Sequence, residues 1–303
     1  MIILRHQQPT AGNKFSILIP TWNNLTYLQL CIHSILKNSS FNHQIIIHVN
    51  EGIDGSLDWV KKSGYSYTYS EHNIGVCWSM NAMRSLALAD YLVFMNDDMY
   101  VCPGWDSALV DEIESIGHPY FYLSSTLIQP RAFWCKSVIS PVSFGESTET
   151  FDEEALLKGY MDHPHGDWNG ATWPPSVVHR DLWDLIGGFS VEFSPGLYSD
   201  PDFSAKLYMA GVRHFKGIDR SRVYHFEARS TGRVKKNNGT KQFLSKWGLT
   251  SSSFMKHILH RGEPFGKYSI HTGKLKRVLI KSRIKLIWGS FSSSGQVKRL
   301  WDR

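Results

Sequence analysis

Four short apolar runs, separated by segments with helical spacing, constrain the fold of residues 15–95. The runs favour strands at 15–20, 44–49, 65–70 and 91–95, and the segments between them favour helices at 25–37, 56–62 and 78–89. Strands that alternate with helices predict a parallel, doubly wound sheet, because a parallel pair needs a crossover connection. The loops after the four strands should then meet in one crevice; they are 20–24, 50–56, 71–75 and 96–99.

The fourth predicted strand ends in the acidic cluster Asn96-Asp97-Asp98. Adjacent carboxylates repel each other and resist burial unless a positive charge lies between them. Mg²⁺ and Mn²⁺ prefer oxygen ligands, so the cluster indicates a divalent cation site. The alternative is that Asp97 and Asp98 only begin the turn before Pro103 and Gly104.

The composition favours one large domain, with or without an appendage. The chain has 303 residues, of which 42% are hydrophobic. Its four widely spaced cysteines show no zinc-ligand spacing, which favours reduced thiols in a cytosolic protein. Residues 1–10 lack the apolar core of a signal peptide, and no run of about 18 apolar residues exists to span a bilayer. We therefore expect a cytoplasmic protein.

Charge is unevenly distributed along the chain. Residues 241–303 hold 14 Lys or Arg and 2 Asp or Glu, a net charge of +12, whereas residues 1–240 carry a net charge of −6. Between 274 and 288 apolar residues alternate with Lys and Arg, as in a basic amphipathic helix. We expect a body at 1–240 and a basic helical extension at 241–303. The extension either binds an anionic partner, such as the cytoplasmic membrane surface, or packs on the body as an ordinary helix.

The second half of the chain is less regular. Residues 146–167 are acidic and rich in histidine, which favours a mobile loop or short helices. Further along the chain, helices are predicted at 181–185 and 200–209, and short strands at 213–216 and 222–226.

Five sequence signals follow one another in order along the chain. They are SILIPTWNN at 16–24, NEGIDGS at 50–56, EHNIGVCWSMN at 71–81, YLVFMNDD at 91–98, and a last group of IGGF, SDPDF and VYHFEARS at 186–189, 199–203 and 223–230. Together they resemble family 2 glycosyltransferases over about residues 15–250. The resemblance implies the GT-A fold, a mostly parallel central sheet flanked by helices. It also implies inverting transfer of a sugar from a nucleotide-diphosphate sugar, with a divalent metal.

In this family a D-x-D motif holds the metal, so Asp98 matches the metal-binding carboxylate. Asn96 stands where the first Asp is usual and removes one negative charge from the site. Asp97 takes the variable middle position, where it is either a nucleotide contact or a solvated turn residue. The cofactor implied is Mn²⁺ or Mg²⁺, which neutralises the leaving diphosphate.

His225 matches the second metal ligand of the family, in the pattern H-x-x-x-x-S that ends at Ser230. An imidazole beside carboxylate and phosphate oxygens suits Mn²⁺. Arg229 and Arg233 could pair with phosphate oxygens or lie on the surface.

The catalytic base of the family is an Asp that begins a helix, and Asp200 of Ser199-Asp200-Pro201-Asp202 matches it. A single displacement needs one carboxylate to take the proton of the acceptor hydroxyl. Asp200 could instead be the N-cap of this helix. Ser199 departs from the commoner Glu, and Asp202 is expected to organise the site or the acceptor.

The resemblance assigns the nucleotide to the loops at the strand ends. The expected contacts are Pro20, Thr21, Trp22, Asn50, Glu51, Asn73, Gly75, Asn81, Asn96 and Asp97. Glu51 stands where the family reads a pyrimidine N–H, with Asn50 and Asp54 as alternatives, so UDP or dTDP is favoured. The Asn at position 96, in place of the usual Asp, raises the chance that the donor sugar is a deoxysugar.

The acceptor is expected to be a glycan or lipid-linked glycan in polysaccharide biosynthesis, and no nucleic acid is expected. Trp168, Gly188 and Asp202 are its expected contacts, and His165 and Asp167 are further candidates. Two alternatives remain. A nucleotidyltransferase would carry more Gly and Lys after its first strand. Asn96 and Ser199 favour a degenerate carbohydrate-binding protein, and retention of the Asp98, Asp200 and His225 matches argues against it.

Overall fold

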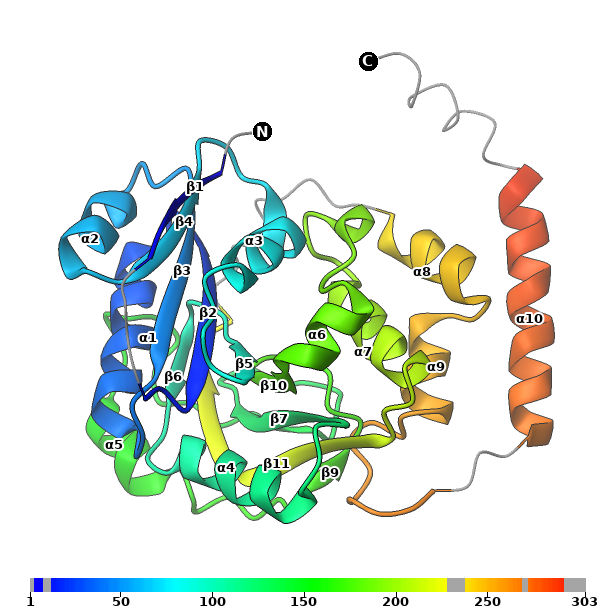
Figure 1. Ribbon diagram of the computed structural model, residues 1–303. Coiled ribbons are helices and arrows are strands. Elements are labelled where there is room, and N and C mark those ends of the chain that lie inside the picture. The colour runs from blue at the N-terminus through cyan, green and yellow to red at the C-terminus, as the bar shows by residue number, and fades with distance from the viewer. Residues whose placement is uncertain (1–2, 8–11, 228–237, 269–271, 292–303) are drawn as a thin grey trace.

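The computed structural model describes residues 3–7, 12–227, 238–268 and 272–291. In these ranges the chain forms an eleven-stranded sheet flanked by helices (Figure 1). The strand order is β1-β4-β3-β2-β5-β10-β7-β11-β6, with β8 beside β7 and β9 beside β11. The expected α/β architecture, a central sheet with helices around it, is confirmed.

The first half of the sheet follows the predicted alternation. Its parallel strands are β2 (Phe15–Trp22), β3 (Gln44–Asn50), β4 (Ser66–Ser70) and β5 (Tyr91–Phe94). Leu18 of β2 pairs with Ile46 of β3 on one side and with Phe94 of β5 on the other. All three side chains are buried, as expected for a sheet covered on both faces.

The connecting helices are α1 (Leu25–Asn38), α2 (Ser56–Ser63) and α3 (Gly75–Arg84). The predicted helix 78–89 therefore begins earlier and ends earlier than expected. It begins at Gly75 because Asn73 Oδ1 accepts a hydrogen bond from the Gly75 N–H at 2.9 Å, which turns the chain into the helix. It ends at Arg84 because the next residues form the tighter bonds of i→i−3 turns.

Three further elements were not among those predicted: α4 (Trp105–Ile116), β7 (Phe121–Ile128) and β10 (Ser176–His179). Every residue of β7 is buried, although Ser124, Ser125 and Thr126 interrupt its apolar pattern. β10 lies antiparallel between β5 and β7, so the sheet is mixed at this point.

The two predicted strands at 213–216 and 222–226 are one strand, β11 (His214–His225). It runs parallel to β7, and its register shifts between Ile218 and Arg222. The end of β11 pairs with β6 (Met99–Val101), with His225 opposite Met99. This pairing brings His225 beside the acidic cluster, although 126 residues separate His225 from Met99 in the sequence.

Helices cover both faces of the sheet in two clusters of buried side chains. One cluster includes side chains of α1, α2 and α4; the other includes α3, α6 (Arg180–Ile186), α7 (Ser199–Met209), α8 (Gly239–Trp247) and α9 (Ser251–His257). The remaining short elements are β1 (Leu4–His6), β8 (Val138–Ile139), α5 (Glu153–Gly159), β9 (Trp168–Asn169) and the 3₁₀ helix at Val191–Phe193. α5 is the short helix anticipated within 146–167.

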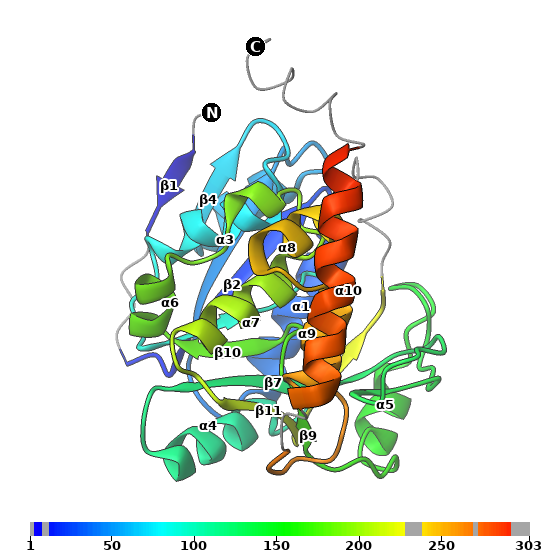
Figure 2. The same ribbon diagram turned by 90° about the vertical axis from the view of Figure 1, so that its right-hand side faces the viewer.

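The last helix, α10 (Thr272–Phe291), lies beside α8 and α9 in both views (Figures 1 and 2). Leu279 packs against the same cluster as Phe243 of α8 and Phe254 of α9, so α8, α9 and the body share a core. The boundary at 240/241 stays a prediction. Within the described ranges, no helix is both long and apolar enough to cross a membrane.

Candidate functional site

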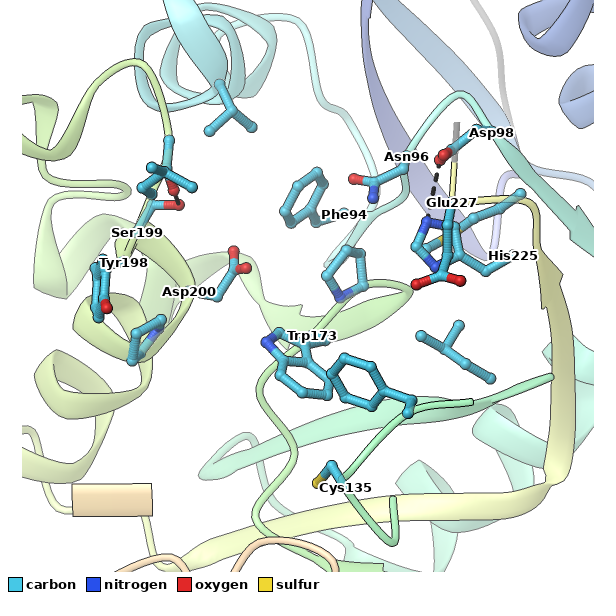
Figure 3. A pocket seen from close by; sticks show the side chains of 18 of the residues that line it. Phe94, Asn96, Asp98, Cys135, Trp173, Tyr198, Ser199, Asp200, His225 and Glu227 are labelled. Atoms are coloured by element: carbon cyan, nitrogen blue, oxygen red, sulfur yellow. Dashed lines mark hydrogen bonds and ion pairs between the residues drawn. The ribbon is translucent and has the colours of Figure 1, made fainter. Parts of the chain in front are cut away.

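One cavity of about 1220 Å³ opens at the carboxyl ends of the parallel strands. The predicted loops converge on it, as the topology requires. Later segments complete its wall: 129, 131–136, 173–174, 195–201, 251–252, 255–256, 260–261 and 263. Figure 3 shows two groups of polar side chains facing this space, with Asp98, His225 and Glu227 on one side and Ser199 and Asp200 on the other.

Asp98 and His225 form the first group. The His225 Nε2 lies 3.4 Å from Asp98 Oδ1, and both side chains are largely buried, at 16% and 7% exposure. Burial by itself lowers the pKa of His225, but the nearby carboxylates of Asp98, Glu227 and Asp97 outweigh burial and raise that pKa. The site thus concentrates negative charge around one imidazole, which favours a bound cation.

Gln129, a residue that the sequence did not single out, orients the His225 ring. Gln129 Nε2 lies 2.8 Å from His225 Nδ1, and no described residue offers a partner to the buried Gln129 Oε1. Reversing the amide brings Oε1 to this contact, where it accepts a hydrogen bond from the Nδ1–H. In that arrangement Nε2 keeps its lone pair and faces Asp98, which is the state needed for a metal ligand.

Glu227 also faces this group and was missed by the sequence prediction. It lines the cavity, and its buried Oε2 has no hydrogen-bond partner in the part of the chain that the structure describes. Its backbone has a φ of 54°, an uncommon value for a residue other than glycine. A buried carboxylate oxygen without a protein partner, close to Asp98 and His225, would suit a bound cation.

The residues present could hold a divalent cation, provided that a diphosphate supplies some of the ligands of that cation. Over the described ranges, no group of three or more His, Cys, Asp or Glu is placed to hold a metal ion alone. Mg²⁺ typically binds one or two protein ligands and completes its shell with phosphate oxygens and water. The pair of Asp98 and His225 matches that requirement.

Asn96 and Asp97 complete the acidic cluster in different ways. Asn96 lines the cavity and is partly exposed. Asp97 is buried, and its Oδ2 accepts a hydrogen bond from Thr21 Oγ1 at 2.6 Å. Asp97 thereby ties the end of β5 to the end of β2, in addition to lining the cavity.

Asp200 is the centre of the second group. It sits in the first turn of α7 and faces the cavity (Figure 3). Burial raises the pKa of Asp200 to about 7, against the opposing effects of the Arg261 charge and a hydrogen bond from Ser199. A carboxylate with a pKa near neutrality can accept a proton at physiological pH.

Most of the residues expected to hold the nucleotide also line the cavity. Those in the wall are Pro20, Thr21, Trp22, Asn50, Asn73 and Gly75. Gly75 has a φ of 77°, and a Cβ there would lie 2.5 Å from Pro195 Cα. The Val76 N–H also donates to Pro195 O at 3.0 Å. This contact fixes the nucleotide loops to the segment that leads into Asp200.

Glu51 lies behind this wall rather than in it. Its Oε2 accepts hydrogen bonds from Trp22 Nε1 at 2.8 Å and from Asn23 Nδ2 at 3.0 Å. Its Oε1 accepts from the Asn73 N–H at 3.3 Å, and these bonds, that from Trp22 first, lower the pKa of Glu51. The Asp54 carboxylate bonds the Leu25 and Ser56 N–H groups. Both carboxylates therefore shape loops.

Asn81 and Gly188 join two elements and do not line the cavity. Asn81 Nδ2 donates to Phe189 O at 2.7 Å, and Asn81 Oδ1 accepts from Phe189 N–H at 2.8 Å. A Cβ on Gly188 would lie 2.4 Å from Asn81 Oδ1, so glycine permits this contact. The pair anchors the segment before Asp200 to α3.

Trp168 and Asp202 are buried in packing. Trp168 is 3% exposed, lies on Gly217 and donates from Nε1 to Thr126 Oγ1 at 2.9 Å. Asp202 is fully buried and accepts a hydrogen bond from Trp247 Nε1 at 2.8 Å, with Lys246 Nζ 3.0 Å away. Asp202 thus binds α8 to α7. His165 and Asp167 also lie outside the wall, and Asp167 pairs with Lys216 at 2.9 Å. Arg229, Ser230 and Arg233 lie outside the described residues.

A third set of residues that line the cavity was not predicted from the sequence. Trp134 and Trp173 come from the middle of the chain, and Arg261 follows α9. The Arg261 guanidinium stacks 3.7 Å from the Trp173 ring centre. An aromatic residue or an arginine in an irregular loop carries no periodic signal, so only the spatial arrangement reveals this group.

Comparison with known proteins gives one family. The model described as glycosyl transferase family 2 matches residues 16–163. Among solved structures, the crystal structure of S. aureus TarS residues 1–349 and that of the same segment in complex with UDP match at 15% and 14% identity. Both have a TM-score of 0.48, and the match covers 68% of this chain and 60% of that chain. A comparison with curated protein sequences finds no match.

Proposed function

Residues 16–163 belong to glycosyl transferase family 2, and from this premise we propose an activity for the whole chain. The chain is an inverting glycosyltransferase that moves a sugar from a nucleotide-diphosphate sugar to a hydroxyl of a glycan or lipid-linked glycan. One observation carries the proposal: the Asp98–His225 pair and Asp200 face the same cavity. One group suits a leaving diphosphate with its metal, and the other suits a reacting hydroxyl.

The donor wall of the cavity comprises the strand-end residues with His225. Its members are Pro20, Thr21, Trp22, Asn50, Asn73, Gly75, Asn96, Asp97, Asp98 and His225. Asp98 and His225 would hold Mn²⁺ or Mg²⁺, which supplies charge neutralisation for the leaving diphosphate. Asp97 and Gly75 hold the loops in place through Thr21 and Pro195.

Asp200 removes the proton of the acceptor hydroxyl. In a single displacement the acceptor oxygen bonds to the anomeric carbon while the bond to the diphosphate oxygen breaks, so the configuration inverts. The proton passes to the Asp200 carboxylate, whose pKa of about 7 suits this role at neutral pH. The N-cap alternative has no support, because the α7 N-cap is Tyr198 and has no side-chain cap bond.

The donor nucleotide is proposed to be UDP or dTDP. Two observations support this: the family match, and the loop geometry. Glu51 holds Trp22 and Asn73, two residues of the cavity wall, through hydrogen bonds. Glu51 acts on the base through these two neighbours, because its own oxygens are already engaged.

A nucleotide screen by thermal unfolding tests the proposal. UDP or dTDP with Mn²⁺ should raise the melting temperature more than GDP with Mn²⁺ or any nucleotide with EDTA. A ligand at 100 times its Kd stabilises by about 2.7 kcal/mol, which such a screen detects easily. Donor hydrolysis and transfer assays then follow with the nucleotide that binds. If no nucleoside diphosphate stabilises the chain, the proposed function is wrong.

We also propose that the basic extension binds an anionic membrane surface, because α10 carries exposed positive charges. Lys276, Arg277, Lys281, Arg283 and Lys285 are exposed there. Ile280 and Ile284 are 57% and 50% exposed on the same helix. Each basic residue near an anionic bilayer contributes about 1 kcal/mol. The full-length chain should float with phosphatidylserine vesicles, and a variant with these five residues changed to Gln should not. Equal flotation of the two proteins contradicts the membrane role.

A further inference from the structure

Arg261 and two tryptophans, Trp134 and Trp173, form a cationic surface in the wall of the cavity. The Arg261 guanidinium lies 3.7 Å from the Trp173 ring centre and 5.3 Å from the Trp134 ring centre. Phe133 packs edge-on against Trp173 at 5.4 Å. Stacking on indoles holds a guanidinium in one plane and leaves its edge available for hydrogen bonding.

The backbone of Arg261 is fixed by close packing. Its Cα would lie 2.7 Å from a Cβ on Gly170, so no other residue type fits at position 170 without movement. The Arg261 N–H donates to Met255 O at 3.0 Å, and the next N–H, of Gly262, donates to Asn169 O at 3.0 Å. The guanidinium therefore projects from a rigid support, as preorganised binding groups do.

The charge of Arg261 has no carboxylate partner within ion-pair distance in the part of the chain described here. Its longer-range neighbour is Asp200, since the Arg261 charge opposes the rise of the Asp200 pKa. Lys136 and Lys256 are exposed cations of the same wall, and Glu263 is an exposed acid there. Lys136 also lies next to Arg261 in space, because a Cβ on Gly262 would lie 3.3 Å from Lys136 Cβ.

Trp134 supplies an apolar face beside this charge. It is 78% exposed although it lines the cavity, so much of its ring is open to a ligand. A half-buried guanidinium suits the oxygens of a phosphate or carboxylate, and an open indole face suits the C–H face of a sugar ring.

Resting on the proposed function, we propose that the acceptor is anionic, a saccharide bearing a phosphate or carboxylate near the hydroxyl that reacts. Arg261 binds the oxyanion, Lys136 adds charge, and Trp134 stacks on the sugar ring. Asp200 and Arg261 then select the acceptor together, because one faces its hydroxyl and the other its charge. We call Trp134, Lys136, Trp173 and Arg261 the acceptor wall.

The test uses three small probes with the full-length chain saturated by UDP and Mn²⁺, so that the diphosphate position is filled. The probes are glucose 1-phosphate, glucuronate and the uncharged methyl glucoside, and their affinities are measured by ligand-observed NMR. A charge-assisted hydrogen bond should make at least one charged probe bind about tenfold tighter than methyl glucoside. The preferred charged probe identifies phosphate or carboxylate as the group recognised.

The variants separate charge from stacking. Arg261→Gln should remove the preference for the charged probe and leave UDP binding unchanged, and Arg261→Lys should restore part of it. Trp134→Ala, at an exposed position that folding does not need, should weaken all three probes. Equal affinity of charged and uncharged probes, or no binding of either charged probe, overturns the inference. Failure of UDP and Mn²⁺ to bind the unchanged chain would instead overturn the proposed function.

Discussion

The donor wall and the acceptor wall of one cavity are built in different ways. The donor wall comes mainly from the ends of parallel strands, and hydrogen bonds fix its polar groups. Thr21 bonds Asp97 within the wall, and Glu51, behind the wall, bonds Trp22. The acceptor wall comes from irregular segments far apart in the chain. It presents an open indole and a guanidinium that has no carboxylate partner within ion-pair distance among the described residues. The family match at 16–163 includes Asp98 and ends before Asp200, His225 and Arg261. If the proposed function holds, regular topology prepares the site of the nucleotide, and irregular loops provide the contacts that distinguish one acceptor from another.

The largest expected effect lies between the walls, at Asp200. Asp200→Asn should lower the rate of transfer by about 10²–10⁴-fold and leave Mn²⁺-dependent UDP binding intact, because general base catalysis contributes that range. The rate of the unchanged chain should rise with pH up to about 7 and then level, as the carboxylate loses its proton. Transfer rates measured from pH 5 to 9 check this, with the exposed Asp58→Asn as control. Normal transfer by Asp200→Asn would show that another group is the base.

In contrast to the change at Asp200, a change at Asp98 should impair nucleotide and metal binding. Asp98→Asn should abolish the stabilisation by UDP with Mn²⁺, and EDTA should do the same to the unchanged chain, because a cation would lose its carboxylate ligand. Asn96→Asp is the matched variant: it adds a carboxylate at the cavity and should tighten Mn²⁺ binding. Calorimetric titration of Mn²⁺ in the presence of UDP measures both. Undiminished binding by Asp98→Asn would remove Asp98 from the metal site.

A change at Gln129 should weaken Mn²⁺ binding less than a change at Asp98 does. Gln129→Leu leaves the His225 ring without its hydrogen bond and should weaken Mn²⁺ affinity by about 10–100-fold, the usual effect of losing an outer-shell partner. Mn²⁺ electron paramagnetic resonance with UDP gives the affinity directly. The melting temperature in the absence of Mn²⁺ is the control, and a change confined to it would assign Gln129 a packing role only.

The smallest expected effects are on stability, at Asp200 and Asp202. These aspartates are two positions apart in the sequence, and their replacement by Asn should change the free energy of unfolding with opposite signs. Asp202→Asn removes the charge that faces Lys246 and should lower the free energy of unfolding by about 2 kcal/mol, after discounting for the partly exposed Lys246. Its transfer rate per folded molecule should stay close to normal. Denaturant unfolding and an activity assay on the same sample check both. A catalytic loss equal to that of Asp200→Asn would place Asp202 in the reaction itself.

For Asp200→Asn the sign follows from proton linkage. Between pH 3.8 and about 7 the unfolded chain releases the Asp200 proton and the folded chain keeps it. Stability of the unchanged chain therefore falls as pH rises through this window, and the Asn variant escapes that loss. At pH 8 the variant should be more stable by about 1–2 kcal/mol, after discounting for partial exposure. Unfolding curves at pH 4 and pH 8 measure the difference, and a variant that is less stable at pH 8 would contradict the raised pKa.

The sequence by itself determined the first half of the sheet and the identity of the chemical groups at its ends. Apolar periodicity is a local property, so β2, β3, β4 and β5 could be predicted within a few residues, and the crevice followed from their order. Asp98, Asp200 and His225 were singled out by motif, and the structure brings all three to one cavity.

Only the tertiary structure decided which neighbours these residues meet. β7 escaped prediction because its polar side chains are buried and find partners on another strand: Ser125 bonds Ser221, and Thr126 donates to Ile218 O. No local pattern records such partners. Trp168, Gly188 and Asp202 were expected to contact the acceptor, yet packing turns them away from the cavity and into contacts between elements. Arg261 lies in a segment without periodicity, and it reaches the cavity because Gly170 lets two backbones approach closely. Long-range packing, which depends on atoms far apart in the chain, therefore set the acceptor wall.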